Sequence, residues 1–417
     1  MSTQSSSVCL PRGVTDRLHG TATRIRYIEE TVLETSAHWG YQLVFPARLE
    51  FEDVVALGGG RDLVGKAFRF DDWESGRMMT VPPDLTPQLA RVSATRMHSL
   101  PYPHRLSYSG VALRHTESQS GQQREILQAG AELIGSPSPV ADAEMLLIVT
   151  QLAEKLGLKN FTINIGHAGI CKGVLAALGL SENSAVMDAI SLKDKTGIQQ
   201  YIESSACPDA DTKQLLALTR LFGGSETLAK ARSLSWNPTT QSALDNLQRI
   251  IETLLASGVN IAKYLTFDLG ETRGLDYHTG ITFEGFTPEI GEALFSGGRY
   301  DTLMQNYGVD MPATGFTCNV GAVAKVLDLQ QGLMQKPAPH IVVLGLDAMY
   351  LKLSQQLRDR NLSAVSLEAD SYQQGLAYAQ AHGIPFVIHP TSDGGFDLIK
   401  CSDMHKQHFR DDKSLET

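Results

Sequence analysis

Apolar side chains recur at helical spacing near the start of the chain, which predicts a long amphipathic helix over residues 21–38. The apolar stripe of this helix consists of Ile25, Ile28, Val32 and Leu33. The sequence GYQLVFPARLEF, residues 40–51, follows as a predicted strand, in which Pro46 ends the pairing because proline donates no backbone hydrogen bond. The first part of the chain therefore predicts a helix that leads through a glycine turn into a strand.

A hairpin and a second helix are predicted next. Residues 66–81 form two apolar stretches around a turn at Glu74-Ser75-Gly76. Thr86 precedes Pro87, an arrangement typical of a helix N-cap followed by proline at the first helical position. On sequence alone, capping is the favoured role for Thr86, ahead of contact with a ligand.

Residues 105–135 predict two strands joined by a polar loop, and the second strand carries the most specific polar pattern in the chain. By period-2 alternation, one face of this strand consists of Arg124, Ile126, Gln128, Gly130 and Glu132. The opposite face, which can bury against helices, consists of Leu127, Ala129, Ala131 and Leu133. The polar face is either solvated or a pocket wall, and the glycine favours the pocket. There a carboxylate can hold an ammonium or imidazolium group, and an amide can orient a carboxylate or a ring nitrogen.

A further strand is predicted over RGLDYHTGITFEGF, residues 273–286, with GGRYD following at residue 297. Strand alternation places Arg273, Tyr277 and Thr279 on one face, with His278 and Glu284 on the other. Two interpretations are equally supported by these residues. The strand forms either the wall of a pocket for an anionic small molecule or a surface strand beside a glycine turn.

The middle of the chain predicts a mostly helical insertion over about residues 165–257. Apolar-periodic segments in and before it cover residues 140–156, 171–179, 184–191, 196–204, 211–222 and 240–257. A short strand, FTINIGHAGI, lies between the first two, and we interpret its His167 as structural rather than as a ligand. Residues 331–339 predict a linker, and residues 340–405 alternate β-rich runs with helical patterns, which predicts a small α/β domain.

Composition narrows the class of protein. The chain has 417 residues, of which 42% are hydrophobic and 20% charged, and a formal net charge of −10 argues against non-specific nucleic-acid binding. Its five cysteines are scattered without a CxxC pair, which predicts reduced thiols and no metal site. Residues 1–10 begin as a polar stretch that predicts a flexible tail rather than a signal peptide, and no apolar run approaches the roughly 20 residues of a membrane helix. We therefore expect a cytoplasmic protein without membrane contact.

RGLDYHTG together with GGRYD resembles a histidine-specific signature of the histidyl-tRNA synthetase family, which has a class II fold. The helix, GY turn and strand of residues 21–51 resemble motif 1, the usual dimer element, and residues 105–135 resemble motif 2. MPATGFTCNVGAVAKVLDL, residues 311–329, resembles motif 3. The resemblance implies an α+β fold. Residues 11–330 would form an antiparallel sheet flanked by helices, with the helical insertion, and residues 340–405 a degenerate counterpart of an anticodon-binding domain.

The same resemblance implies which residues would contact a bound histidine. The candidates are Asp84, Thr86, Arg114, Gln128, Glu132, Arg273, Tyr277 and His278. Asp84 and Thr86 match positions that hold the amino group of histidine, although the synthetase usually has a glutamate where this chain has Asp84. In the synthetase, the residue matching Arg114 would contact the ATP phosphate.

Two departures from the synthetase pattern predict that adenylate formation is lost. Thr116 stands where the family has a glutamate in motif 2. In motif 3, Gly321 and Ala322 stand where an acidic residue and the phosphate-binding arginine are expected, and Lys325 lies about one helical turn further on. A planar guanidinium suits a polyphosphate in a way that no uncharged side chain can replace. We therefore predict no catalytic residue and no cofactor.

The order and wording of LPRGVTD, SGRMMTVPPDLTPQLAR, IGHAGI, RGLDYHTG, GGRYD and PATGF resemble regulatory subunits of the short-form ATP phosphoribosyltransferase. Such a protein would form dimers, bind and activate the short catalytic subunit in the first step of histidine biosynthesis, take part in inhibition by L-histidine, and bind no tRNA. Two alternatives remain open at this point. One is an active histidyl-tRNA synthetase that uses ATP, histidine and tRNA, and the other is a stand-alone histidine sensor.

Overall fold

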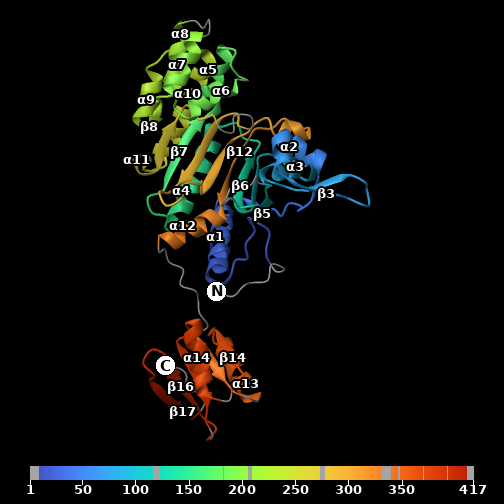
Figure 1. The fold of residues 1–417 in the computed structure, drawn as a ribbon, viewed down its shortest axis with the longest axis vertical. Coiled ribbons are helices and arrows are strands. Elements are labelled where there is room, and N and C mark those ends of the chain that lie inside the picture. The colour runs from blue at the N-terminus through green and yellow to red at the C-terminus, as the bar shows by residue number, and fades with distance from the viewer. Residues whose placement is uncertain are drawn as a thin grey trace. The chain divides into compact units, whose positions relative to one another are not determined.

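The computed structural model divides into two compact units, Met1–Leu333 and Met334–Thr417 (Figure 1). The structure describes residues 9–115, 123–181, 183–204, 209–272, 278–330, 340–345, 348–369, 371–391 and 393–410. The predicted linker and most of the predicted N-terminal tail therefore lie outside the described residues.

Nine of the described strands form the sheet of the first unit, in the order β1-β5-β6-β12-β11-β10-β7-β9-β8. Their bounds are β1 Gln42–Leu43, β5 His104–Leu113, β6 Glu125–Ile134, β7 Thr162–His167, β8 Phe222–Gly223, β9 Leu265–Asp268, β10 Ile281–Phe286, β11 Phe295–Arg299 and β12 Ala313–Asn319. The central strands pair antiparallel as predicted, but β1 with β5 and β7 with β9 pair parallel. The sheet is therefore mixed, because two of its strands are reached by connections that return the chain in the same direction.

One face of this sheet is covered by helices α1 His19–His38, α4 Pro139–Lys155 and α12 Val320–Leu329 (Figure 1). Ala129, Ala131 and Leu133 of β6 are buried in the same hydrophobic core as Ile28 and Val32 of α1. The period-2 prediction for β6 is thus confirmed on its apolar face, since burial of these side chains against α1 stabilises the register. The helix predicted over residues 21–38 is confirmed as well.

The other side carries a small three-stranded sheet, in the order β2-β4-β3, together with two helices. The bounds are β2 Glu50–Phe51, α2 Glu52–Gly65, β3 Phe68–Asp71, β4 Met78–Val81, α3 Thr86–Arg96 and the 3-10 helix η2 Met304–Tyr307. The predicted hairpin over residues 66–81 is confirmed. The single strand predicted over residues 40–51 is wrong in extent, because β1 joins the large sheet and β2 joins the small one.

The helical insertion follows β7 directly. Its elements are α5 Ala168–Ala177, α6 Ser184–Ser191, α7 Lys195–Ser204, α8 Asp209–Leu218, α9 Glu226–Arg232, α10 Pro238–Ala256 and α11 Ile261–Tyr264. His167 caps the first of these helices, since its ring accepts a hydrogen bond from the amide of Gly169, Nδ1 to N 3.1 Å. Burial lowers the pKa of His167 to about 4, so the ring is neutral, in keeping with a structural role. Helix α9 and strand β8 were not predicted.

The strand predicted over residues 273–286 is shorter than expected. Strand β10 begins at Ile281, and His278, Thr279 and Gly280 are not in a strand. The predicted sharing of faces by period 2 therefore fails for His278 and Thr279. Arg273 and Tyr277 lie outside the described residues.

The second unit contains a sheet of five described strands, in the order β14-β13-β15-β16-β17. Its elements are β13 Ile341–Leu344, α13 Ala348–Asp359, β14 Ala364–Leu367, α14 Tyr372–His382, β15 Phe386–Pro390, β16 Phe396–Lys400 and β17 Lys406–Phe409. The alternating strands and helices were predicted, whereas the antiparallel strands β16 and β17 were not. Across both units, none of the helices within the described ranges has the length and apolar character needed to cross a membrane.

Candidate functional site

A cavity of about 400 Å³ lies on the face of the large sheet away from α1, over the adjacent strands β6, β12 and β11. Six of the residues singled out by sequence line this cavity: Asp84, Thr86, Arg114, Gln128, Glu132 and His278. They come from the start of α3 and the segment before it, from β6, from the residue that follows β5, and from the chain preceding β10. The tertiary structure thus brings together side chains up to almost 200 positions apart in sequence.

Glu132 is the most deeply buried charged group of the cavity, with 1% of its surface exposed. Thr86 donates a hydrogen bond from its hydroxyl to Oε1 of Glu132 at 2.8 Å, and the Tyr300 hydroxyl donates to Oε2. Gly315 pairs with Glu132 across β12 and β6, and a methyl group at Gly315 would overlap Oε2. The carboxyl group therefore occupies the space that a glycine leaves on the neighbouring strand.

Burial raises the pKa of the Glu132 carboxyl from its ordinary value of 4.5 to about 8. The nearby Asp84 carboxylate acts in the same direction, whereas the hydrogen bonds from Tyr300 and Thr86 stabilise the charged form and oppose the rise. A buried carboxyl with a pKa near neutrality can either accept from or donate to a ligand. The imidazole of histidine, which also titrates near neutrality, is a chemically suitable partner.

Thr86 does not act as the predicted helix cap. Helix α3 begins at Thr86 itself, its N-cap is Leu85, and the Thr86 amide donates to Oδ1 of Asp84 at 3.4 Å. The local pattern of threonine and proline predicted capping, but the Thr86 hydroxyl is instead used by Glu132, 46 positions away in sequence. This long-range contact cannot be seen in a local sequence pattern.

Asp84, Gln128 and Arg114 form a connected polar rim. The Gln128 amide donates to Oδ1 of Asp84 at 3.4 Å, and the Arg114 guanidinium lies 3.4 Å from Oδ2 of the same carboxylate. Arg114 also donates from Nε to the carbonyl of Pro83 at 2.8 Å, so its orientation is constrained by two partners. The rim thus presents a carboxylate held between an amide and a guanidinium, an arrangement suited to a ligand with both ammonium and carboxylate groups.

Gly130 lies between Gln128 and Glu132 on β6, but it is buried and is not one of the residues that line the cavity. It pairs with Tyr108 of β5 on one side and Thr317 of β12 on the other, and the two side chains meet, hydroxyl to hydroxyl, at 2.6 Å. A methyl group at Gly130 would lie 2.8 Å from the Tyr108 hydroxyl oxygen and would overlap the carbonyl of Phe316. Gly130, which favoured a pocket on sequence grounds, is therefore required by the close packing of β6 against its neighbouring strands.

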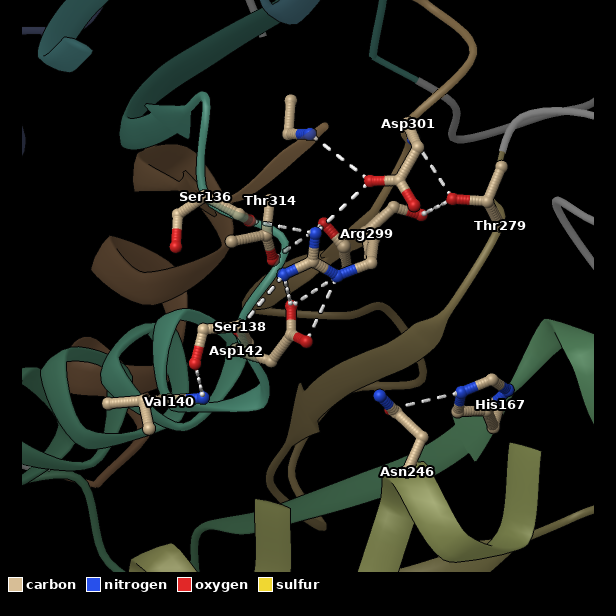
Figure 2. A network of polar contacts seen from close by, with 12 residues as sticks. Ser136, Ser138, Val140, Asp142, His167, Asn246, Thr279, Arg299, Asp301 and Thr314 are labelled. Carbon is tan, nitrogen blue, oxygen red and sulfur yellow. Dashed lines mark hydrogen bonds and ion pairs between the residues drawn. The ribbon is translucent and has the colours of Figure 1, made fainter. Parts of the chain in front are cut away.

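The residues of the GGRYD stretch serve both the site and the scaffold, and Figure 2 shows the scaffold contacts of Arg299 and Asp301. Arg299 is buried and donates from Nε to both carboxylate oxygens of Asp142, at 3.1 and 3.0 Å, and from Nη1 to Asp301 at 3.1 Å. Its guanidinium also donates to the carbonyls of Ser136 and Ser138, so it ties β11 to the start of α4. Tyr300, the next residue, reaches the cavity instead. Its role was missed at the sequence level, although the GGRYD motif contained it.

A second cavity, of about 1,300 Å³, shares the lining residues Arg114, Ile126, Glu292 and Asn319 with the first and therefore adjoins it. Ala322 and Lys325 of α12 line it. Ala322 is 3% exposed, and its amide donates to the side chain of Asn319, the N-cap of α12, at 3.1 Å. The position where a phosphate-binding arginine was expected thus carries a buried methyl group. Thr116, the other departure noted above, lies outside the described residues.

The charges around the second cavity are balanced. Among the described lining residues, four carry a formal positive charge and four a negative one: Arg17, Lys66, Arg114 and Lys325 against Asp16, Glu125, Glu289 and Glu292. Arg17 is moreover paired with Glu125 at 3.2 Å. A polyphosphate would therefore meet little net attraction from these side chains. No cluster of histidine, cysteine or acidic side chains suited to a metal ion occurs within the described ranges.

The chain is similar in sequence to proteins of known family. A family model described as histidyl-tRNA synthetase matches residues 13–323. A protein from Geobacter sulfurreducens named ATP phosphoribosyltransferase regulatory subunit is 44% identical over 381 residues, which cover 90% of this chain and 86% of that protein. A protein of the same name from Syntrophotalea carbinolica is 40% identical over 405 residues, covering 95% and 94%.

Solved structures show the same fold at lower identity. A crystal structure from Bacillus halodurans, described as an ATP phosphoribosyltransferase regulatory subunit/histidyl-tRNA synthetase, has a TM-score of 0.79 at 24% identity and covers 90% of this chain and 97% of that one. Histidyl-tRNA synthetase from Nostoc sp. PCC 7120 has a TM-score of 0.81 at 21% identity and covers 99% of both chains. Since the high sequence identities extend over most of both lengths, this chain belongs to the family of ATP phosphoribosyltransferase regulatory subunits, which share the class II fold of histidyl-tRNA synthetase.

Proposed function

We propose that this chain is a non-catalytic subunit that binds and activates the short-form catalytic subunit of ATP phosphoribosyltransferase in the first step of L-histidine biosynthesis. In the same complex it takes part in feedback inhibition by histidine. The observation that carries the proposal is the contrast between the two cavities. The smaller one keeps a connected set of buried polar groups, whereas the larger one has a buried alanine, Ala322, in place of the expected arginine.

The electrostatics of the larger cavity support the proposed loss of adenylation. Transfer of a nucleotidyl group requires positive charge positioned against the phosphates. Lys325 is the base nearest to Ala322 along α12, and a lysine ammonium is a point charge without the bidentate geometry of a guanidinium. The balance of charges among the described lining residues argues further against binding of ATP in a reactive geometry. An active synthetase is therefore the weaker candidate.

Histidine fits the groups of the smaller cavity. We propose that Asp84 and Gln128 hold the amino group and that Arg114 faces the carboxylate. Glu132, oriented by Tyr300 and Thr86, then meets the imidazole. Arg273, Tyr277 and His278 complete the proposed set of contacts. The volume of about 400 Å³ accommodates a small amino acid together with water.

Activation is proposed to occur as a shift in population. A subunit without catalytic groups raises the turnover of its partner only if it binds the active conformation of that partner more tightly than the inactive one. Histidine in the pocket would reduce this preference if it binds more tightly to complexes with the inactive catalytic subunit than to those with the active one. The coupling must then be reciprocal, so that the conformation of the catalytic subunit also changes the affinity for histidine. The pocket and the contact with the catalytic subunit are thereby linked energetically.

Self-association as a dimer is part of the proposal. Strand β1 lies at the edge of the large sheet, where the resemblance places the dimer element. Phe45, which follows this strand, is 77% exposed, and Leu43 is 47% exposed. Large apolar side chains exposed beside an open sheet edge are typical of a surface that another chain covers. The expected assembly pairs dimers of this chain with dimers of the catalytic subunit.

The test is the phosphoribosyltransferase activity of a cognate short catalytic subunit, with and without this protein, at saturating ATP and phosphoribosyl pyrophosphate. We expect a clear rise in turnover when the chain is present and no activity from the chain alone. No change in turnover and no complex would refute the proposal. Histidine-dependent exchange between ATP and pyrophosphate tests the alternative, and appreciable exchange would identify a synthetase.

The histidine part is tested with a matched pair of variants. Asp84→Asn removes the carboxylate from the rim of the pocket, whereas Asp188→Asn makes the same change at an exposed position of α6. We expect inhibition by histidine to weaken in complexes with the first variant and to stay at the wild-type level with the second. Equal inhibition in both would show that histidine acts elsewhere.

A further inference from the structure

The helical insertion makes polar contacts with the chain on both sides of residues 273–277. On the incoming side, the Thr272 hydroxyl donates to the carbonyl of Met187 in α6 at 3.2 Å. On the outgoing side, Lys172 of α5 donates from Nζ to the carbonyl of His278 at 2.7 Å. The helical insertion therefore holds the chain both immediately before residue 273, at Thr272, and immediately after residue 277, at His278.

The incoming side is secured further upstream. Lys193, which follows α6, lies 2.6 Å from Oδ1 of Asp268 at the end of β9 and also donates to the carbonyl of Gly270 at 3.2 Å. A methyl group at Gly270 would overlap the carbonyl of Leu218, the last residue of α8. The ion pair and the close approach of the two backbones allow little relative movement between the insertion and β9, the strand that precedes residues 273–277.

The outgoing side leads directly into the pocket. His278 lines the cavity and packs over Gly298, where a methyl group would lie 2.7 Å from Cδ2 of the ring. Thr279 then donates from its amide to the carbonyl of Arg299 at 2.8 Å and accepts at its hydroxyl from the amide of Asp301 at 2.9 Å (Figure 2). The backbone of Arg299 and Asp301 at the end of β11 therefore holds Thr279 from the sheet side. Lys172 thus holds the same short stretch, His278 and Thr279, from the side of the helical insertion.

Helix α5 cannot shift independently of the sheet. Ile170 of α5 and Leu244 of α10 are buried in one hydrophobic core with Ile165 of β7 and Ile281 of β10. Densely packed cores transmit displacement rather than absorb it. A change in the position of α5 is therefore passed to β10 through apolar packing and to His278 through Lys172.

We infer that Lys172 is a positioning residue for the ligand pocket and couples it to the helical insertion. By donating to the His278 carbonyl, it holds one wall of the cavity in the geometry that binds ligand. A hydrogen bond from a charged donor is stronger than one from a neutral donor. The bond between Lys172 and the His278 carbonyl is of this kind and is partly buried. Because such coupling is reciprocal, occupation of the pocket also favours one position of α5. The inference deepens the proposed function and rests on it where the ligand is histidine.

The test uses the full chain in four forms: wild type, Lys172→Met, Lys172→Arg and Lys213→Met. The methionine side chain keeps much of the apolar length of lysine but removes the donor, and arginine restores a charged donor. Lys213 is an exposed lysine on α8 of the same insertion and serves as the control. L-Histidine affinity is measured by calorimetry, and backbone hydrogen exchange is measured over residues 278–286 in the absence of ligand.

We expect Lys172→Met to weaken histidine binding about tenfold, equivalent to about 1.4 kcal/mol, and to raise exchange over residues 278–286. Lys172→Arg should recover most of the affinity, and Lys213→Met should match the wild type. A role limited to the stability of α5 would lower the thermal unfolding midpoint without changing the affinity of the folded protein, and that result would overturn the inference. If the methionine variant does not fold, Lys172→Gln replaces it, with the same expectations.

Failure of the proposed function gives a different result. If the wild type activates the catalytic subunit but binds no histidine, the histidine part of the proposed function is refuted. Hydrogen exchange then decides the positioning role by itself: equal exchange over residues 278–286 in wild type and Lys172→Met would overturn it. If the wild type binds histidine and Lys172→Met binds it equally well, the inference is wrong and the proposed function stands.

Discussion

Replacing Glu132 by glutamine should remove a large pH dependence from the stability of the first unit. Glu132 is 1% exposed, and burial raises its pKa to about 8, compared with 4.5 for an ordinary glutamic acid. Between these two values the folded protein keeps the proton while the unfolded chain has lost it. The folded state therefore binds more protons, and the free energy of unfolding must fall as the pH rises.

The magnitude follows from the two pKa values. Each unit of difference between the two pKa values is worth about 1.4 kcal/mol. The titration of Glu132 should therefore lower the free energy of unfolding by roughly 5 kcal/mol between the pH of the ordinary pKa and that of the raised one. This stability is fully present below about pH 4.5, is lost progressively as the pH rises, and reaches a plateau above about pH 8. Glutamine has the same shape and no ionisation, and the hydroxyl groups of Thr86 and Tyr300 can reorient to accept from its amide.

The assay is urea unfolding of wild type and Glu132→Gln over the range from about pH 5 to pH 9, at constant ionic strength. Tryptophan fluorescence suits the measurement because Trp39, Trp73 and Trp236 all belong to the unit that contains Glu132. Glu125→Gln, on the same strand but paired with Arg17 and partly exposed, is the control and should follow the wild type. Comparing variants cancels the titration of all other groups.

We expect the variant to gain stability relative to the wild type steadily as the pH rises. Parallel profiles for wild type and Glu132→Gln would refute the reasoning, because they would mean that Glu132 titrates alike in the folded and unfolded chains. A gain that appears equally in Glu125→Gln would point to net charge rather than burial. In either case the argument that burial raises the pKa of Glu132 toward neutrality, which makes it a suitable partner for an imidazole, would lose its physical basis.

Two further predictions concern the scaffold and the floor of the pocket. Arg299→Met should lower the free energy of unfolding by about 3–5 kcal/mol, because it leaves the Asp142 carboxylate buried without its bidentate partner, and the double variant with Asp142→Asn should recover part of this loss in a urea double-mutant cycle. An additive double variant would contradict a direct pairing. Gly315→Ala should cost about 1–3 kcal/mol and abolish histidine binding in calorimetry, since the new methyl group displaces the Glu132 carboxyl. Gly321→Ala, whose methyl group would lie 3.6 Å from Oδ1 of Asn319 in ordinary contact, is the control and should bind as the wild type does.

Much of the scaffold can be predicted because its signals are periodic and local. The apolar stripe of α1 and the alternation along β6 each identify an element and the face that it buries, since only one rotation of a helix and one register of a strand hide those side chains. The alternation also places Gln128 and Glu132 on the face opposite the core, where both line the cavity. The missing arginine at Ala322 can likewise be read from the motif alone.

Pairing between distant strands is where prediction from sequence ends. The parallel pairing of β1 with β5 and of β7 with β9 depends on how connecting helices return the chain, and no local pattern encodes it. Strand β17 was missed for a related reason, whereas β16, Phe396–Lys400, is a mostly buried apolar strand that was not predicted from the sequence. Short strands with exposed, polar residues, such as Lys406–Phe409, acquire their conformation mainly from the neighbour to which they bond.

The chemistry of the pocket divides in the same way. The sequence by itself determined which residues have ionisable side chains and which residues of a strand share a face, because both follow from the order of residues along the chain. Only the tertiary structure decided that Thr86 contacts Glu132 instead of capping a helix, and that Tyr300 reaches the pocket while Arg299 secures α4. These assignments depend on which strands and helices become neighbours. Burial among those neighbours is also what raises the pKa of Glu132, a property that no isolated segment of the chain possesses.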